Sequence, residues 1–442
     1  MHIAHPPQTR LNDTPAEEKE PYIYQSGFGN YHSSEALPDA LPLRGNVPLK
    51  SRYNLYPEHL NGTTFVSPRE LAFHLWMYRG KPSAAHEPFS PLSCEDGDDC
   101  INNDPPKLEA CFLPTNPNVK FTPQPYTWGS LAPSLDSISD ESLTFIQGLR
   151  TLAGNGDATL SEGLAIHQYA FNTSMPNQAF VNHDGEFLII PQTGALDIKS
   201  ELGMLRIRPG FIAVLPPGLR YSINLLGPGT VAKGYVLELF GGAHFTLPAL
   251  GPLGANGLAR PNDFQYPVAS FDPPDHSSPS WEIVVKLSGK LYAYAQPHSP
   301  FDVVAWHGRY APYRYDLSLF SHLATHTDQL DPTAFTVLVA PSLRPGVNLV
   351  DFCIFGGGEK WLVARDTVRG LPYYHRTVAT EVCGVVKGVY KGSSRPLTEG
   401  GLSFEGGWMP HGEGLEVWRR GAEEKEEDNR VPRLLGGGYL GE

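Results

Sequence analysis

Positive charge is scarce in this sequence. Its 442 residues include 34 lysines and arginines against 47 aspartates and glutamates, which gives a formal net charge of −13 at pH 7. The basic residues form no long run, so the chain lacks the positive surface that binding to nucleic acid or to an anionic membrane requires. We therefore expect neither nucleic acid nor a membrane among its partners.

Cysteines and long apolar runs are also few. The cysteines number five, too few and too irregularly spaced for a disulfide framework, and no CxxC pair suggests a zinc site. No apolar stretch approaches the roughly 18–20 residues that cross a bilayer, and the start of the chain, MHIAHPPQTR, has no apolar signal core. The sequence thus predicts a soluble protein that is not exported and resides in the cytoplasm.

Glycine and proline, by contrast, are abundant, with 45 and 42 residues. They are interspersed with valine, isoleucine, tyrosine and phenylalanine, a pattern typical of tight turns between short strands. Strand-like segments form one series from residue 185 to 225 and another from 281 to 390, separated by a stretch rich in proline and serine at 272–279. A mostly β protein with two β units in tandem follows, with one helix expected over 137–149.

Two histidines and a glutamate in the second series form a candidate metal site. His375 and Glu381 are six residues apart, and in an extended strand this even spacing places both side chains on one face. A third ligand is available in His411, after a turn. Two neutral imidazoles and one carboxylate suit Fe(II) and leave open positions for O2 chemistry. The alternative is one structural histidine and a salt-bridged glutamate.

The first series resembles a cupin barrel that has lost its metal. Gly210, Pro216 and Gly218 follow the spacing of the second cupin motif, but Tyr221 stands where the motif has its metal-binding histidine. This half of the chain is therefore expected to be a metal-free, cupin-like β-sandwich. Function would then depend on the second unit.

Long collinear blocks, spread over about residues 22–412, resemble the homogentisate 1,2-dioxygenase family. The blocks are YQSGFGN at 24–30, YNLY at 53–56, GEFLIIPQ at 185–192, LGPLGANGLA at 250–259, PFDVVAWHG at 300–308 and PYYHR at 372–376. A string of such blocks is far more specific than one metal motif. The resemblance implies a cupin-type jelly-roll fold with few helices. It also implies an assembly as a hexamer of two stacked trimers.

The resemblance further implies an activity and a site. Members of this family use O2 to open the ring of homogentisate, an intermediate of tyrosine and phenylalanine catabolism, and form maleylacetoacetate. By residue-by-residue similarity, His375, Glu381 and His411 are the expected Fe(II) ligands. His307 matches the histidine that handles the substrate hydroxyl proton, and Tyr390 matches a tyrosine near the substrate. His307, Tyr390 and His411 are the expected substrate contacts.

The implied organisation has four parts. Residues 1–20 are expected to be a disordered arm, 21–280 the metal-free sandwich, 281–412 the iron-binding cupin-like domain and 413–442 a disordered, charged and glycine-rich tail.

The chain departs from the family pattern at three places. Glu405 stands where the family has a second histidine near the last ligand, residues 355–360 are changed, and the charged tail replaces further β structure. These departures leave two alternatives open. One is a catalytically impaired paralogue that acts as a binding or assembly protein, and the other is a related ring dioxygenase with a gentisate-like substrate.

Overall fold

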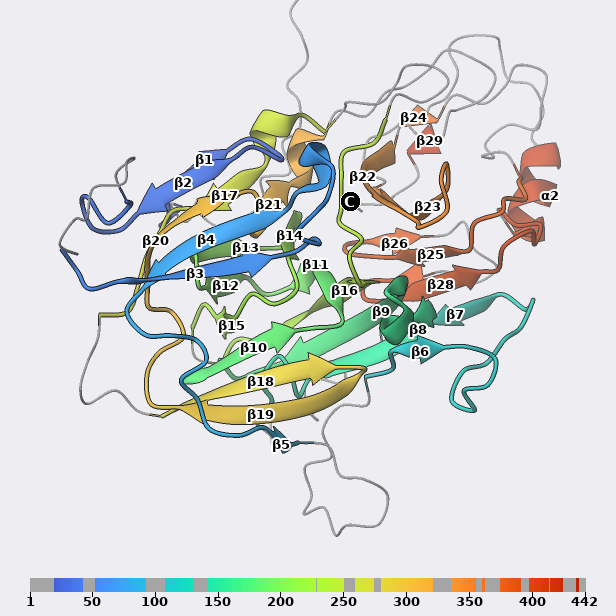
Figure 1. Cartoon of the computed structure of the whole chain (residues 1–442). Helices are drawn as coiled ribbons and strands as arrows, with labels where there is room; N and C mark the ends of the chain where they lie inside the picture. The colour runs from blue at the N-terminus through green and yellow to red at the C-terminus, as the bar shows by residue number, and fades with distance from the viewer. Residues whose placement is uncertain are drawn as a thin grey trace, which may run out of the picture.

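The computed structural model of the chain is built almost entirely from β-strands (Figure 1). It describes residues 20–42, 52–92, 108–130, 142–227, 229–249, 259–273, 280–320, 335–354, 360–361, 374–390, 397–412, 414–423 and 435–436. The mostly β fold class expected from the sequence is confirmed. Among these residues, no helix has the length and apolar character needed to cross a membrane.

A nine-stranded sheet forms the middle layer of the molecule. Its order is β1 (Tyr24–Ser26), β17 (Gln265–Pro267), β21 (Tyr313–Asp316), β14 (Phe211–Leu215), β11 (Gly185–Thr193), β16 (Ala232–Phe240), β9 (Glu162–Phe171), β8 (Leu149–Asp157) and β6 (Cys111–Phe112). Side chains alternate along its central strands: Phe187 and Ile189 face one core and Leu188 faces another. The sheet is therefore covered on both sides.

A seven-stranded sheet covers one face and completes a β-sandwich. Its order is β13 (Gly203–Ile207), β12 (Leu196–Ser200), β15 (Tyr221–Leu225), β10 (Gln178–Asn182), β18 (Trp281–Leu287), β19 (Lys290–Gln296) and β5 (Ser90–Pro91). Ile198, Ile223 and Val284 from this sheet bury with Phe187 of the middle layer. The sandwich core expected for the first series is thus present.

A four-stranded sheet covers part of the opposite face. It consists of β2 (His32–Glu35), β20 (Val303–Gly308), β4 (His74–Arg79) and β3 (Tyr56–Asn61), in that order. Its inward residues, among them Met77 and Trp306, pack with Leu188 and Val214 in a second core. Its other face carries half-buried and exposed side chains, including His307 and Trp76.

The C-terminal residues form smaller sheets beside the sandwich (Figure 1). The paired strands are β22 (Thr336–Pro341) with β23 (Asn348–Cys353), β25 (Glu381–Gly384) with β28 (Leu402–Glu405) and β7 (Tyr126–Trp128), β26 (Val389–Tyr390) with β27 (Leu397–Thr398), and β24 (Lys360–Trp361) with β29 (Leu435–Gly436). The hydroxyl of Tyr235 on β16 lies 3.2 Å from the carbonyl oxygens of both Val385 and Gly401, which ties these sheets to the middle layer.

The strand pairing does not break at the expected boundary, residue 280. Strand β18 runs parallel to β10 and pairs Val284 with Phe180, while β21 pairs Tyr313 with Val214 of β14. Residues 281–316 therefore complete the sheets of the first unit instead of starting a second one. The hydrophobic pattern correctly predicts these strands but cannot show their partners, because strand pairing connects segments that are distant in sequence.

The helix and tail predictions also need correction. Within the described part of 137–149, the Gly148 N–H donates to the Thr144 carbonyl in a single turn, and Leu149 already begins β8. The apolar residues at three-residue intervals, such as Ile146 and Leu149, are buried by one turn and do not form a helix. Residues 415–423, predicted as disordered tail, form the helix α2 (Leu415–Glu423), helped by an ion pair between Glu416 and Arg419. The predicted arm, up to residue 19, lies outside the described residues.

Candidate metal centre

Three predicted ligands come together next to β25. His375 and His411 form an isolated antiparallel bridge, in which each backbone N–H lies 3.1 Å from the carbonyl oxygen of the other residue. Glu381 is the first residue of β25. One donor atom from each of the three side chains lies within 4.8 Å of the other two.

The carboxylate of Glu381 lies between the two imidazoles. Its Oε1 is 2.9 Å from His375 Nε2, and its Oε2 is 3.2 Å from His411 Nε2. The two ring centroids are 4.1 Å apart. Two imidazole nitrogens and a carboxylate that converge in this way form a donor set that suits a mononuclear non-haem iron.

His411 is held in a tautomer that suits metal binding. Its Nδ1 lies 2.9 Å from the Met409 carbonyl oxygen and donates its proton there, which leaves Nε2 as the nitrogen available to a metal. Burial alone would lower the pKa of His411, but the Met409 carbonyl and the nearby carboxylates raise it above the usual value. No sequence motif points to Met409. Its only hint was a position two residues before a ligand.

A tight turn delivers His411 to the site. The Met409 N–H donates to the Gly406 carbonyl, and Trp408 adopts a left-handed φ of 67°. A Cβ at position 407 would lie 2.7 Å from the Val378 carbonyl oxygen, so only glycine fits there without a shift. Gly407 thus lets the chain turn back from β28 toward His375.

Glu405 lies beside the triad. It is directly opposite Glu381 in the β25–β28 pair and is half-buried. Burial and the charge of Glu381 raise the pKa of Glu405, while His411 opposes them. Its carboxylate does not belong to the group of three close donors found among the described residues.

A large open cavity connects these residues. Its volume is about 3190 Å³, and its wall includes the three candidate ligands, Glu405 and Tyr390 of β26. Strands of the middle sheet form the facing wall, through residues such as Tyr235 and Leu237. Tyr390 therefore lines the same cavity as the triad.

His307 lies elsewhere. It is on β20 in the four-stranded sheet and is absent from the described residues that line this cavity. Its Nε2 is 3.0 Å from the Tyr78 hydroxyl, and its Nδ1 contacts the Tyr31 hydroxyl. Burial and the neighbouring His74 lower its pKa, which favours the neutral imidazole. One copy of the chain therefore does not bring His307 to the triad.

Tyr221, at the position of the missing cupin histidine, lies inside the first sandwich. It is 1% exposed and packs edge-on against Phe180, with ring centroids 5.6 Å apart. Burial raises the pKa of its hydroxyl well above the usual value, so this position holds a neutral phenol.

Comparisons with known proteins agree over most of the chain. The N-terminal family of homogentisate 1,2-dioxygenase matches residues 23–317, and the C-terminal family matches residues 318–436. The division between them follows β21, in line with the sheet pairing described above. Among solved structures, a cupin-2 domain containing protein from Shewanella frigidimarina covers 25% of this chain and 95% of its own, at 14% identity and a TM-score of 0.18.

Curated relatives match at much higher identity. Homogentisate 1,2-dioxygenase of Arabidopsis thaliana is 45% identical over 90% of this chain and 81% of its own length. The enzyme of the same name from Dictyostelium discoideum is 40% identical over 94% of this chain and 90% of its own. The chain belongs to the homogentisate 1,2-dioxygenase family.

Proposed function

We propose that this protein uses O2 to open the aromatic ring of homogentisate at a mononuclear Fe(II), giving maleylacetoacetate. The convergence of His375, Glu381 and His411 is the observation that supports the iron site, because it unites two imidazoles and one carboxylate within 4.8 Å. The names of the curated relatives support the substrate.

The chain's own residues have distinct tasks in this reaction. His375, Glu381 and His411 would hold Fe(II), which when bound supplies adjacent open positions for a ring oxygen and for O2. The hydrogen bond from His411 Nδ1 to the Met409 carbonyl keeps the imidazole in the metal-binding tautomer. Tyr390 and His411 line the cavity and orient the ring.

His307 is the proposed acceptor of the substrate hydroxyl proton. Its lowered pKa keeps the imidazole neutral and able to accept a proton at the pH of the cytoplasm, where we place the protein. The hydroxyls of Tyr31 and Tyr78 contact the two ring nitrogens and orient the ring, and the substrate hydroxyl has to replace one of them. Because His307 is on a separate sheet of the same chain, this role needs a second copy whose β20 approaches the triad.

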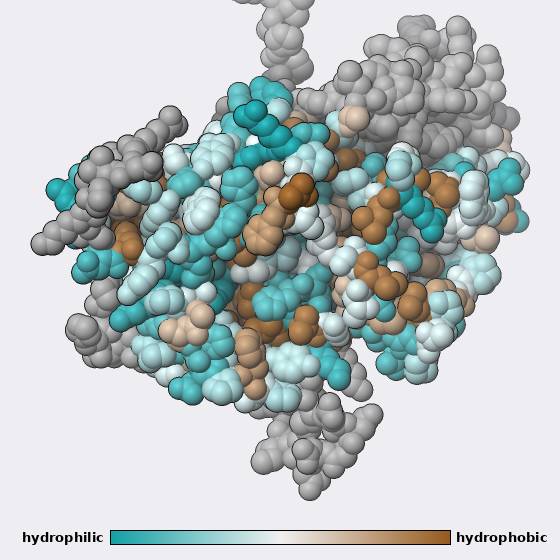
Figure 2. All heavy atoms as spheres, viewed as in Figure 1, coloured by the Kyte–Doolittle hydropathy of each residue, from teal (hydrophilic) through white to brown (hydrophobic). Residues whose placement is uncertain are grey.

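We therefore propose a homo-oligomer, and a hexamer of two trimers as its form. Apolar side chains next to the triad support an interface there: Val378 is 72% exposed and Trp408 is 65% exposed. Figure 2 shows hydrophobic residues exposed on the right half of the molecule, over the C-terminal strands. Clustered exposed apolar residues of this kind mark surfaces that bind other chains.

The experiment compares substrates on the purified protein. After loading with Fe(II) under anaerobic conditions, O2 uptake is followed with homogentisate and, separately, with gentisate. We expect stoichiometric uptake with homogentisate and the formation of maleylacetoacetate. Uptake only with gentisate would reassign the substrate, and loss of uptake with iron retained would favour a binding or assembly protein. The Glu381→Ala variant provides the baseline.

A further inference from the structure

A second cleft lies beside a buried charge network, and it shares no lining residue with the metal cavity. Its volume is about 430 Å³, within the range of roughly 300–1,000 Å³ typical of small-molecule sites. Charged groups form one side of the cleft and apolar groups the other. Its lining residues include Glu58, Leu60, Met77, Ala84, Glu201 and Arg220.

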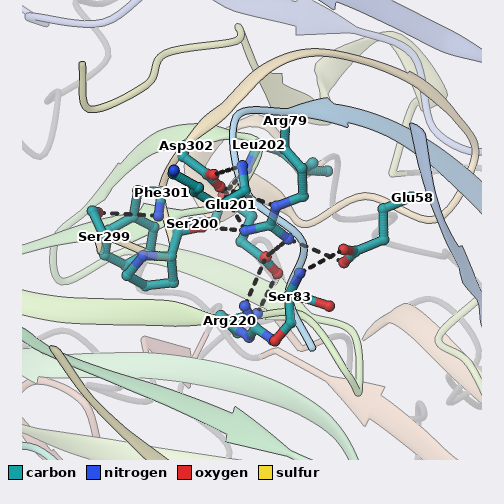
Figure 3. A network of polar contacts seen from close by, with 12 residues as sticks. Glu58, Arg79, Ser83, Ser200, Glu201, Leu202, Arg220, Ser299, Phe301 and Asp302 are labelled. Carbon is teal, nitrogen blue, oxygen red and sulfur yellow. Dashed lines mark hydrogen bonds and ion pairs between the residues drawn. The ribbon is translucent and has the colours of Figure 1, made fainter. Parts of the chain in front are cut away.

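Arg79 is at the centre of the charge network, where its guanidinium faces Glu58, Glu201 and Asp302 (Figure 3). It is 0% exposed and makes five hydrogen bonds, two to Asp302 and one each to Glu58, Glu201 and the Pro300 carbonyl. Since a guanidinium has five N–H groups, Arg79 has none left for a ligand. Its role here is to fix the carboxylates of Glu58 and Glu201 at the cleft.

Arg220 is different, because part of its guanidinium lacks an acceptor. The residue is 9% exposed, its backbone N–H donates to Glu201, and its Nη2 donates to the Ser83 carbonyl at 3.3 Å. Its buried Nη1 has no hydrogen-bond acceptor among the described residues and lies 3.9 Å from Glu201 Oε1, while the Tyr294 hydroxyl lies close to the guanidinium. A buried donor without an acceptor is costly, so a ligand oxygen at this point would be favoured.

The charge balance selects the kind of ligand. Glu58, Glu201 and Asp302 bring three negative charges and Arg79 and Arg220 bring two positive ones, so the network has a net charge of −1. A simple anion would meet this excess of negative charge. A zwitterion avoids this repulsion, because its cationic group can approach a carboxylate of the network while its own carboxylate pairs with Arg220.

Glu58 is placed to receive such a cationic group. Its side chain is 26% exposed, and its two oxygens each accept one hydrogen bond, from Arg79 and from the Ser83 N–H. Carboxylate oxygens have capacity for further donors. Leu60, Met77 and Ala84 provide an apolar wall next to these charges.

We propose that this cleft binds a zwitterionic α-amino acid with an apolar side chain. The ligand's carboxylate pairs with Arg220, its ammonium group with Glu58, and its side chain packs on Leu60 and Met77. This site is separate from the metal centre and does not depend on the proposed reaction.

Calorimetry on the full-length protein, without substrate, tests the proposal. L-Leucine is titrated alongside two analogues that each lack one charged group, 4-methylpentanoate and 3-methylbutylamine. We expect saturable binding of L-leucine and at least about tenfold weaker binding of both analogues, equivalent to losing one charge-assisted contact. Equal binding of 4-methylpentanoate would overturn the zwitterion assignment. No saturable binding of L-leucine at about 10 mM would overturn the site.

Variants locate the binding. Arg220→Gln removes the cation, and Glu58→Gln removes the anion while it keeps the side-chain shape. Ala84→Trp, at an exposed rim position, fills the cleft without touching the charge network, so it keeps the test valid if Arg220→Gln does not fold. We expect each variant to weaken L-leucine binding at least about tenfold. Unchanged binding in Ala84→Trp would overturn the assignment to this cleft.

Discussion

Glu381 and Glu405 lie directly opposite each other in the antiparallel pair of β25 and β28, with both side chains on the same face. Like charges in such a position destabilise a sheet unless a cation lies nearby. Glu381 contacts two imidazoles that form the candidate iron site, whereas Glu405 does not belong to that donor group. The second carboxylate therefore adds negative charge next to the place where an anionic substrate would bind.

Replacing Glu405 with glutamine is expected to raise kcat/KM for homogentisate by about tenfold, or about 1.4 kcal/mol of transition-state stabilisation. The substitution keeps the shape of the side chain and removes the charge that repels the substrate's carboxylate. Steady-state O2 uptake measures it. Glu416→Gln, the same change on α2 where the side chain is 87% exposed, serves as the control. A fall in kcat/KM would mean that Glu405 takes part in the reaction.

The same substitution has a pH-dependent effect on stability. Because the pKa of Glu405 is raised above 4.5, its ionised form costs free energy in the folded protein. This cost is present at neutral pH and disappears as the pH falls below 4.5. The metal-free Glu405→Gln protein should therefore have a larger free energy of unfolding than the metal-free parent at pH 7 but not at pH 4. Urea denaturation at the two pH values measures this difference. A gain that persists at pH 4 would contradict this explanation.

Removal of any one ligand is expected to abolish metal retention. Among the described residues three side chains form the donor group, so His375→Ala, Glu381→Ala or His411→Ala leaves two of them. We expect less than about a tenth of the bound iron, given the 10–100-fold losses that even outer contacts produce. Metal analysis of the purified proteins decides it. Full iron occupancy in Glu381→Ala would disprove the assignment, and Glu416→Gln should keep its iron.

His307→Phe is expected to keep its iron and lose activity by about 10²–10⁴-fold, the usual contribution of a general acid or base. If the site is shared between copies, a mixture of His307→Phe and Glu381→Ala chains should recover activity after joint refolding. Some sites in the mixed oligomer would then combine an intact triad with an intact His307. Recovery would not occur if both residues served the same site within one chain.

The sequence singles out the three side chains that converge in the structure, but not their surroundings. The even spacing of His375 and Glu381 predicts a shared face, and His411, after a turn, is the third candidate; the resemblance assigns all three as ligands. In the structure, Glu381 starts β25 while His375 lies before it in an isolated bridge, so the two do not share one continuous strand. The donors converge because His375 pairs with His411 across 36 residues, a contact that no local pattern encodes.

For the fold, too, local patterns predict the strands but not the contacts between distant segments. Alternating apolar residues correctly predicted strands such as β12, where Leu196 and Ile198 are buried and Asp197 is not. The pattern could not show that β18 would join β10 and move the expected boundary, because both strands are buried on both faces and would suit several partners. Nor could it place His307 on a sheet remote from the triad.

A buried ion network lies inside the first sandwich. Lys286 is 0% exposed, and its ammonium lies 2.5 Å from Asp184 and 2.9 Å from Glu238. Glu238 is also buried and lies 2.9 Å from His167 Nε2. Burial alone would raise the pKa of Glu238, but Lys286 and His167 bring it down to about 2.

Glu238→Gln should therefore destabilise the protein by about 3–5 kcal/mol at pH 7, the usual cost of breaking a buried ion pair. Because the folded-state pKa lies below 4.5, the contribution of Glu238 is present above that pH and is lost as the pH falls toward 2. The stability difference between variant and parent should then shrink between pH 4.5 and pH 2. Urea denaturation across this range measures it, with Glu282→Gln, an exposed change on the same strand as Lys286, as the control. A difference that stays constant down to the lowest pH at which both proteins remain folded would mean that Glu238 acts by packing and not through its charge.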